Sequence, residues 1–233
     1  MAIEIEGVAR KSMVMFFLID TSGSMAGRSI ASVNDAMREV IPDIQDISDS
    51  NADTNIKLAV MDFADNPKWI SSEPQELSSV SWTDLGTYGG TNMGKAFKEL
   101  ASKLSTDEFL NDPSGNKAPV VILLTDGAPG DNYKEGITVL NQNPWFKKSI
   151  KVALGVEDAR MSVLEEFTGN KESAIYLKDK GLLKRLLHVV SVSASVVGSK
   201  TSINSESDAS AAQEAVIENV KEEMENSVSD DEW

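Results

Sequence analysis

Two continuously apolar segments, each closed by an aspartate, constrain the fold of this chain more than any other feature. The first is MVMFFLID at residues 13–20, and the second is APVVILLTDG at residues 118–127. A strand with one face in water alternates apolar and polar residues, whereas a strand buried on both faces is apolar throughout. Both segments are therefore predicted to be central strands of a sheet that is covered on both sides.

Up to about residue 199, the rest of the chain alternates between helical and strand patterns. Helices are expected over residues 28–48, 92–110, 131–142 and 160–168 and from residue 181 onwards, and strands over 55–64, 149–156 and 173–179. Pro42 lies inside the first helical pattern, so a kink or an early end is expected there. Strands that alternate with helices predict an α/β fold: a doubly wound, mostly parallel sheet flanked by helices.

The composition excludes several kinds of site. The chain of 233 residues has no cysteine and one histidine, His188, so disulfides, thiolate zinc sites and sites with two imidazoles are excluded. The net charge of −15 argues against nucleic acid as the main partner. The N-terminal segment lacks the layout of a signal peptide, and its apolar run is too short to span a bilayer, so a cytoplasmic location is expected.

An acidic tail is expected to follow the α/β domain. We place the boundary of the domain, residues 1–199, where small polar residues begin to dominate. Residues 201–233 carry ten acids and one base, Lys221. Such a composition buries little apolar surface, which predicts a largely disordered tail over residues 200–233. Within it, Ala212, Val216, Val220 and Met224 follow one another at roughly one helical turn, which predicts a weak amphipathic helix.

The polar residues that follow the first apolar strand point to a hard cation. Asp20, Ser22 and Ser24 are alternate residues, and Asp126 ends the second apolar strand. If the two strands are neighbours, the acids share one crevice at the carboxyl edge of the sheet. Acids and hydroxyls together form an all-oxygen set, which suits Mg²⁺ first. The simpler alternative is that Asp and Ser only cap the following helix.

Three kinds of enzyme site fit these motifs poorly. A haloacid-dehalogenase-like phosphatase requires a second aspartate two positions after the first, where this chain has Ser22. The spacing from Gly89 to Lys95 fits a P-loop, but Ala96 stands where the Mg²⁺-binding hydroxyl belongs. The serine of GSMAG follows its glycine directly and so does not form a nucleophile elbow. We therefore expect a protein that is not an enzyme.

Together, three motifs resemble a known family. DTSGS after an apolar strand, GGT opening a helix and LLTDG closing a later strand look like the metal-ion-dependent adhesion site of von Willebrand factor A domains. The resemblance covers roughly residues 10–199 and implies the Rossmann-like fold of that family. It implies a metal site built by Asp20, Ser22, Ser24, Thr91 and Asp126, with Mg²⁺ as the ion and Mn²⁺ or Ca²⁺ as alternatives.

The resemblance also implies a function. A partner carboxylate fills an open position on the ion, so the domain acts in protein recognition or as a scaffold. LIDTSGSM, GGTNMGKA and LLTDGAPGD are most similar to the bacterial tellurium-resistance-associated (TerY-like) type. That type implies tellurite or stress resistance, with a metal-dependent Ser/Thr phosphatase and a kinase as partners. Two alternatives stay open: a metal-dependent hydrolase acting on a phosphoryl substrate, and a structural subunit whose metal is always bound.

Overall fold

The computed structural model describes residues 9–229, except for the side chains of Lys180 and residues 226–229. Within them, seven strands form one sheet in the order β3-β2-β1-β5-β6-β7, with β4 paired to β2. The strands are β1 (Lys11–Asp20), β2 (Thr54–Phe63), β3 (Pro67–Trp69), β4 (Gln75–Glu76), β5 (Val120–Thr125), β6 (Ile150–Val156) and β7 (Ala174–Leu177). β3 and β4 pair antiparallel with β2, and all other pairs are parallel. The predicted fold class, a mostly parallel sheet flanked by helices, is confirmed.

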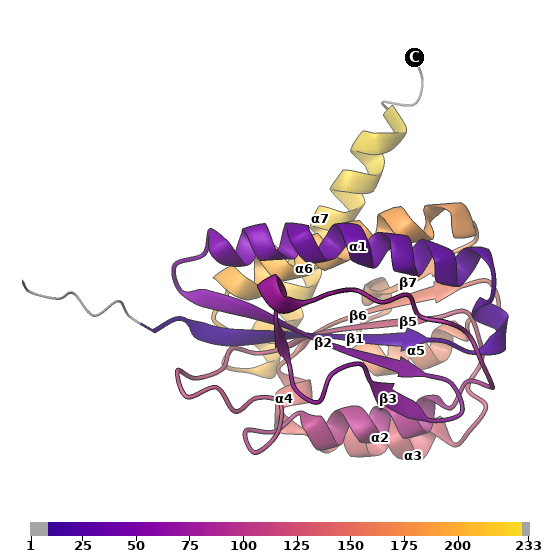
Figure 1. Ribbon diagram of the computed structural model, residues 1–233, viewed down its shortest axis with the longest axis horizontal. Helices are drawn as coiled ribbons and strands as arrows, with labels where there is room; N and C mark the ends of the chain where they lie inside the picture. The colour runs from indigo at the N-terminus through magenta and orange to yellow at the C-terminus, as the bar shows by residue number, and fades with distance from the viewer. Residues whose placement is uncertain (1–8, 230–233) are drawn as a thin grey trace, which may run out of the picture.

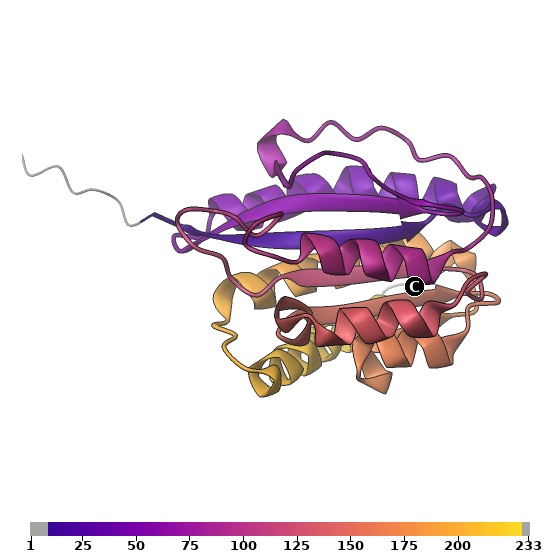
Figure 2. The ribbon, with the colours of Figure 1, turned by 90° about the horizontal axis from the view of Figure 1, so that it is seen from below.

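Helices cover both faces of the sheet (Figures 1 and 2). They are α1 (Arg28–Asp49), α2 (Met93–Lys103), α3 (Tyr133–Gln142), α4 (Pro144–Lys147), α5 (Met161–Thr168), α6 (Leu183–Lys200) and α7 (Glu206–Ser229). Short 3₁₀ turns occur at η1 (Gly23–Met25), η2 (Leu77–Ser79), η3 (Lys171–Ser173) and η4 (Lys180–Leu182). α1, α6 and α7 lie on one face, and α2 to α5 lie on the other. No helix in the described part of the chain is long and apolar enough to cross a membrane.

Strand β1 contains the first continuously apolar segment, and both of its faces are buried. Its alternate residues face opposite ways, so Met15 and Phe17 join the core under α1 and α6, while Phe16 and Leu18 join the core over α2 and α5. All four side chains are buried. The apolar pattern of β1 is therefore the direct consequence of helices on both of its faces.

Two helix boundaries differ from the sequence-based prediction. α1 continues through Pro42 to Asp49, so the expectation of an early end was wrong. Pro42 is exposed, so the carbonyl of Arg38, which loses its helical partner, lies on the solvent side of the helix. α2 ends at Lys103, shorter than expected, because Leu104 leaves the helical conformation.

The expectation of a largely disordered tail was wrong for residues 206–229. These residues form α7, which packs against α6 and β6. The apolar stripe itself was predicted correctly, because Ala212, Val216 and Val220 are buried and Met224 packs beside them. The composition of the segment was misleading because its acids occupy the exposed face while its few apolar residues meet a surface supplied by the domain. Residues 230–233, also assigned to the tail, lie outside the described part of the chain.

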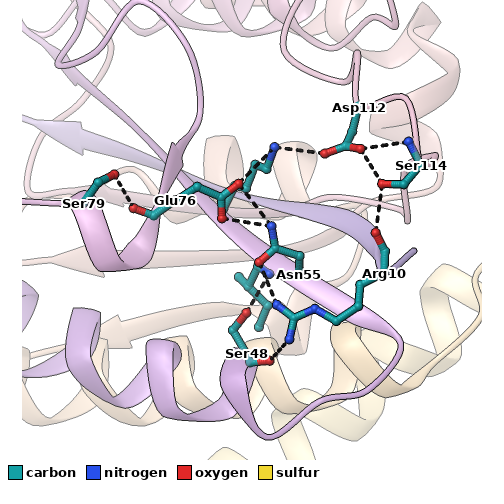
Figure 3. A network of polar contacts seen from close by, with 9 residues as sticks. Arg10, Ser48, Asn55, Glu76, Ser79, Asp112 and Ser114 are labelled. Atoms are coloured by element: carbon teal, nitrogen blue, oxygen red, sulfur yellow. Dashed lines mark hydrogen bonds and ion pairs between the residues drawn. The ribbon is translucent and has the colours of Figure 1, made fainter. Parts of the chain in front are cut away.

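A polar network fixes the end of the sheet at which β1 and β2 begin (Figure 3). The guanidinium of Arg10 donates to the carbonyl of Ser48 at 2.9 Å and to Asn55 Oδ1 at 2.9 Å. Lys57 Nζ donates to Asp112 Oδ2 at 2.9 Å, and Ser114 Oγ donates both to Asp112 and to the carbonyl of Arg10. The network ties α1, β2 and the loop before β5 to Arg10, the residue that precedes β1.

Candidate metal centre

Three loops at the carboxyl end of the parallel strands carry the residues that the sequence assigned to a metal site. β1 and β5 are neighbours, and the sheet continues in opposite directions from them, to β2 and to β6. This reversal is the place where open α/β sheets bind ligands. The register sets Ile19 beside Leu124, so Asp20 and Asp126 leave the sheet close together. Thr91 comes from the loop that precedes α2.

Asp20 is fully buried, and both of its carboxylate oxygens accept hydrogen bonds. The N–H of Ser22 donates to Oδ1 at 2.8 Å, and the hydroxyl of Thr125 donates to Oδ2 at 2.5 Å. Burial raises the pKa of the Asp20 carboxyl in spite of these bonds, and the negative charge of Asp126 raises it further. A cation placed beside the two acids would stabilise both in their charged form.

The two serines form a hydrogen-bonded chain that ends on the second acid. Ser22 Oγ and Ser24 Oγ lie 3.0 Å apart, and Ser24 Oγ donates to Asp126 Oδ1 at 2.6 Å. Ser22 and Asp126 are buried, whereas Ser24 is exposed. The two ends of the chain are therefore buried, and its middle member, Ser24, forms the side that is open to solvent.

Gly127 brings the third loop against Thr91. A Cβ atom added to Gly127 would lie 3.2 Å from Thr91 Oγ1 and 3.9 Å from Ser24 Oγ. Both hydroxyls therefore line the small space that the missing side chain leaves. The five predicted residues thus lie together: Asp20 is the last residue of β1, and Ser22, Ser24, Thr91 and Asp126 lie in the three loops that meet beside it.

Backbone hydrogen bonds join these loops to one another. Gly23 N donates to Gly89 O at 3.1 Å, which links the first loop to the second. Gly130 N donates to Thr91 O at 2.6 Å, which links the second to the third. The positions of the hydroxyls are therefore set by the sheet edge, and the site needs little ordering before it binds a ligand.

Three supporting residues were missed by the sequence analysis. The hydroxyl of Thr125 donates a hydrogen bond to Asp20, and in the sequence only its place in the LLTDG motif indicates this role. Asp65 Oδ1 accepts from Gly90 N at 2.9 Å, and the carboxylate of Asp131 accepts from the first N–H groups of α2 at 2.8 and 2.9 Å. Asp131 lies 37 residues from the glycine that it binds, so no local pattern identifies it.

The donor set fits a hard divalent cation. It consists of two carboxylates and three hydroxyls, and oxygen ligands of this kind suit Mg²⁺, Mn²⁺ or Ca²⁺. No group of three or more His, Cys, Asp or Glu side chains that could hold a metal occurs among the described residues. The hydroxyls are therefore indispensable to the candidate centre, which sets it apart from sites built on carboxylates or imidazoles alone.

A cavity of about 400 Å³ lies beside the segment before Thr91, which is tied to the first loop by Tyr88 N donating to Thr21 O at 2.8 Å. Asp62 and Tyr88 line it, and Tyr88 OH donates to Asp62 Oδ2 at 3.1 Å. The Thr21 hydroxyl, between two of the candidate ligands in the chain, donates to the same oxygen at 3.5 Å. Tyr88 and Ile70 are exposed at the cavity. The surface beside the metal centre thus offers both an apolar rim and a buried acid.

The single histidine lies in the helical layer rather than in these loops. His188 Nε2, on α6, is 2.5 Å from Asp43 Oδ2, on α1. It is thereby committed to a contact between two helices, and no imidazole is available to the loops that carry the metal centre. The arrangement offers ligands for a cation, but no histidine that could serve as its general base.

Comparisons with known proteins agree with the fold. In sequence, the chain is 23% identical over 178 residues to the human collagen alpha-6(VI) chain, covering 74% of this chain and 7% of the collagen chain. It is 20% identical over 185 residues to inter-alpha-trypsin inhibitor heavy chain H2 from Mesocricetus auratus, covering 70% of this chain and 19% of that protein. This chain thus spans less than a fifth of the length of either relative.

Solved structures give the same result. A von Willebrand factor type A protein from Catenulispora acidiphila matches with a TM-score of 0.58 and 17% identity, over 80% of this chain and 43% of that one. Proximal thread matrix protein 1 from the mussel byssus, in a form with a zinc-occupied MIDAS motif, matches with a TM-score of 0.57 and 15% identity, over 81% of this chain and 49% of that one. At such identities, the likeness shows the fold alone.

The strongest comparison is with a family as a whole. The sequence model of the von Willebrand factor type A domain matches residues 15–188, which include every strand after the start of β1 and all three candidate loops. The match covers well over half of the chain. The chain therefore belongs to the von Willebrand factor type A domain family.

Proposed function

We propose that this domain is a protein-recognition module that depends on a divalent cation and has no catalytic activity. Mg²⁺ is the proposed ion, with Mn²⁺ and Ca²⁺ as alternatives, and Asp20, Ser22, Ser24, Thr91 and Asp126 are the proposed ligands. The observation that carries the proposal is that the oxygens of Ser22, Ser24 and Asp126 form one hydrogen-bonded chain, with Asp20 and Thr91 beside it.

The chemistry of the donor set explains why such a site recognises an acid. Two of the five ligands are carboxylates, which balance the formal charge of a divalent ion, and five ligands leave the sixth position of an octahedral Mg²⁺ open. The ion supplies a positively charged position for a carboxylate oxygen of a partner. Ser24 is exposed and marks the side from which that carboxylate would enter. The neighbouring cavity at Tyr88 and Ile70 would take the partner's adjacent side chains.

The cellular role that we propose follows from the resemblance of the three motifs to the TerY-like type. The domain would act in the bacterial cytoplasm as a scaffold for a metal-dependent Ser/Thr phosphatase and a kinase, in tellurite or stress resistance. The partner would supply an aspartate or glutamate to the ion. The collagen and inhibitor relatives are parts of much longer proteins, so they support the recognition module and not this particular pathway.

Capture of partners from the native host tests the proposal. The immobilised chain is incubated with lysate in Mg²⁺ and, in parallel, in EDTA, and partners are expected only with Mg²⁺. Thr91→Ala should lower the affinity for the partner more than the affinity for the metal ion, if Thr91 binds the ion mainly when the partner is bound. Thr138→Ala, an exposed threonine on α3, is the matched control. Equal capture with and without EDTA would rule out recognition through the ion.

The two rival functions have different signatures. A hydrolase would turn over a generic phosphate ester such as p-nitrophenyl phosphate when Mg²⁺ is added, and we expect no turnover above the Asp126→Ala background. A structural subunit with a permanently bound metal would keep its complex after chelation. Turnover that depends on Asp126, or a complex that survives EDTA, would favour the corresponding rival.

A further inference from the structure

The end of the sheet opposite the metal centre, where β1 begins, is on the left in Figure 1. A second cavity, of about 200 Å³, lies at this end. Lys11 at the start of β1 and Lys117 before β5 line it from one side. Trp145 of α4 and Lys148, which follows that helix, line it from another side, and Ser202 and Asn204 of the α6–α7 linker close it. Each of these residues belongs to a different connection from those that build the metal centre.

The charge of this cavity opposes that of the rest of the chain. The chain has 37 acids and 22 bases, so a random surface cavity would be expected to carry more acids than bases. Instead, three lysines line it, and the described lining residues include no acid. Within the described chain, none of the three lysines makes an ion pair, whereas Lys57, Lys98, Lys103, Lys134, Lys147, Lys184 and Lys221 each do.

Two acids at the start of α7, beside the linker that closes the cavity, are occupied elsewhere. Glu206, at the start of α7, pairs with Lys147 at 3.6 Å rather than with Lys148. The carboxylate of Asp208 accepts from the N–H groups of Asn204 and Ser205, each at 3.0 Å. Neither carboxylate therefore neutralises the lysines.

The backbone holds the first two lysines close together. Ser12 N donates to Gly115 O at 2.9 Å, and Lys117 N donates to Ser12 O at 2.7 Å, so the turn before β5 is fastened to the start of β1. Lys117 is partly buried, and its Nζ donates to the carbonyl of Ser199. Burial lowers the pKa of its ammonium, the negative charge of Asp53 opposes this, and the positive charge of Lys11 lowers it further. Concentrating like charges here is unfavourable unless an anion compensates for it.

We propose that this cavity binds a phosphate group. A dianion can pair with more than one ammonium at once, whereas a single carboxylate would leave at least two of the three lysines uncompensated. Ser202 and Asn204 supply further hydrogen-bond donors for the remaining phosphate oxygens. The ring of Trp145 offers an apolar surface for the group to which the phosphate is attached.

The site is a feature of this chain beyond its family domain. Residues 202–204 lie outside the stretch matched by the family model, which ends at residue 188. They connect α6 to α7, so a bound phosphate would fasten the start of α7 to the sheet. Binding should therefore stabilise the whole chain by mass action, apart from any effect on the metal centre.

Two measurements test the proposal on the full chain, in EDTA and at constant ionic strength. The first is the rise in melting temperature with inorganic phosphate, and the second is the set of amide NMR shifts during the same titration. We expect saturable binding, with the largest shifts at residues 117, 148 and 202–204. The double variant that carries Lys11→Gln and Lys148→Gln should bind inorganic phosphate at least tenfold more weakly. Lys98→Gln, which removes one charge from α2, is the control and should leave it unchanged.

Further probes distinguish the sources of the phosphate. N-acetyl-O-phosphoserine amide represents a phosphorylated protein side chain, and inorganic phosphate represents the free ion. Tighter binding of the phosphoserine probe would assign the site to a phosphoprotein, and tighter binding of inorganic phosphate would assign it to the free ion. The proposal fails if acetate binds as tightly as phosphate, if the double variant binds phosphate normally, or if Lys98→Gln weakens binding equally.

Discussion

Ser24 Oγ lies 2.6 Å from Asp126 Oδ1, although 102 positions separate the two residues in the sequence. The contact exists because β1 and β5 are parallel neighbours whose following loops leave the same edge of the sheet. Both oxygens are assigned to one ion in the function that we propose. The hydrogen bond therefore holds two ligands together in advance, which lowers the ordering cost of binding a cation.

Removing the second acid should eliminate metal binding without unfolding the chain. We expect Asp126→Ala to weaken Mg²⁺ by at least ~100-fold, because a charged ligand is lost from a site with only two. The unfolding free energy without metal should change by less than about 1 kcal/mol, since the change also removes a negative charge that acts on Asp20. Titration calorimetry and urea unfolding measure the two quantities. Asp107→Ala, at an exposed turn, is the control, and normal Mg²⁺ affinity in Asp126→Ala would refute the assignment.

A single methyl group at Gly127 should disturb the same centre. The Cβ of Gly127→Ala would lie 3.2 Å from Thr91 Oγ1, so the threonine or the third loop must shift. We expect Mg²⁺ affinity to fall by about tenfold, the size of effect seen when a residue that orients a ligand is changed. Gly86→Ala is the matched control, because its added Cβ meets no atom within 4 Å. Calorimetry that shows no loss in Gly127→Ala would place Thr91 outside the site.

The first loop and the two strands were predictable from the sequence because each has a local signal. An apolar run that ends in aspartate identifies a strand, and the spacing of Asp20, Ser22 and Ser24 identifies the loop. Asp65 and Asp131 could not be predicted, because each accepts hydrogen bonds from residues 25 and 36–37 positions away. Their role depends on which loops the sheet brings together, and no local pattern in the sequence predicts that pairing of loops.

Helix α7 shows a different limit. The spacing of Val216 and Val220 predicted the apolar stripe of the helix. The composition of a segment, however, indicates only how much surface the segment can bury by itself. The surface that α7 buries is supplied by α6 and β6. Gln213 adds a contact that no pattern indicates, since its side chain reaches Lys151 N, Ser173 Oγ and the carbonyl of Thr168.

Acid should weaken the network at the start of the sheet (Figure 3). The Ser114 hydroxyl, together with Lys57, lowers the pKa of Asp112 to about 2. Because the folded-state pKa is lowered, the charged carboxylate stabilises the fold above the unfolded-state pKa, and this contribution is lost as pH falls towards 2. We expect a loss of about 1 kcal/mol, allowing for solvent screening.

Removing the serine hydroxyl isolates the cause of this shift. Ser114→Ala should raise the pKa of Asp112 towards its ordinary value, because the largest stabilising hydrogen bond is gone. A carboxyl-carbon NMR titration of both proteins measures the change. Ser102→Ala, an exposed serine on α2, is the control. An Asp112 pKa that stays near 2 in Ser114→Ala would show that Lys57 and the backbone N–H of Ser114 set it without the hydroxyl.

Helix α7 should behave as a part of the folded domain. Val216 is fully buried, so Val216→Ala should lower the unfolding free energy by about 2 kcal/mol. Gln213→Ala should cost about 1–3 kcal/mol, because it leaves the partly buried N–H of Lys151 without its acceptor. The exposed neighbour Glu214→Ala is the control and should stay within about 0.5 kcal/mol.

Truncation after Ser199 extends the same test to the whole helix. The shortened chain exposes the apolar surface of α6 that Val216 and Ile217 cover, so it should unfold at lower urea concentration and expose more surface to hydrophobic dyes. In the full chain, the amides of residues 213–224 should exchange as slowly as those of α6, because the two helices unfold together. Rapid exchange over that range, or an unchanged unfolding free energy after truncation, would mean that α7 is only loosely attached to the domain.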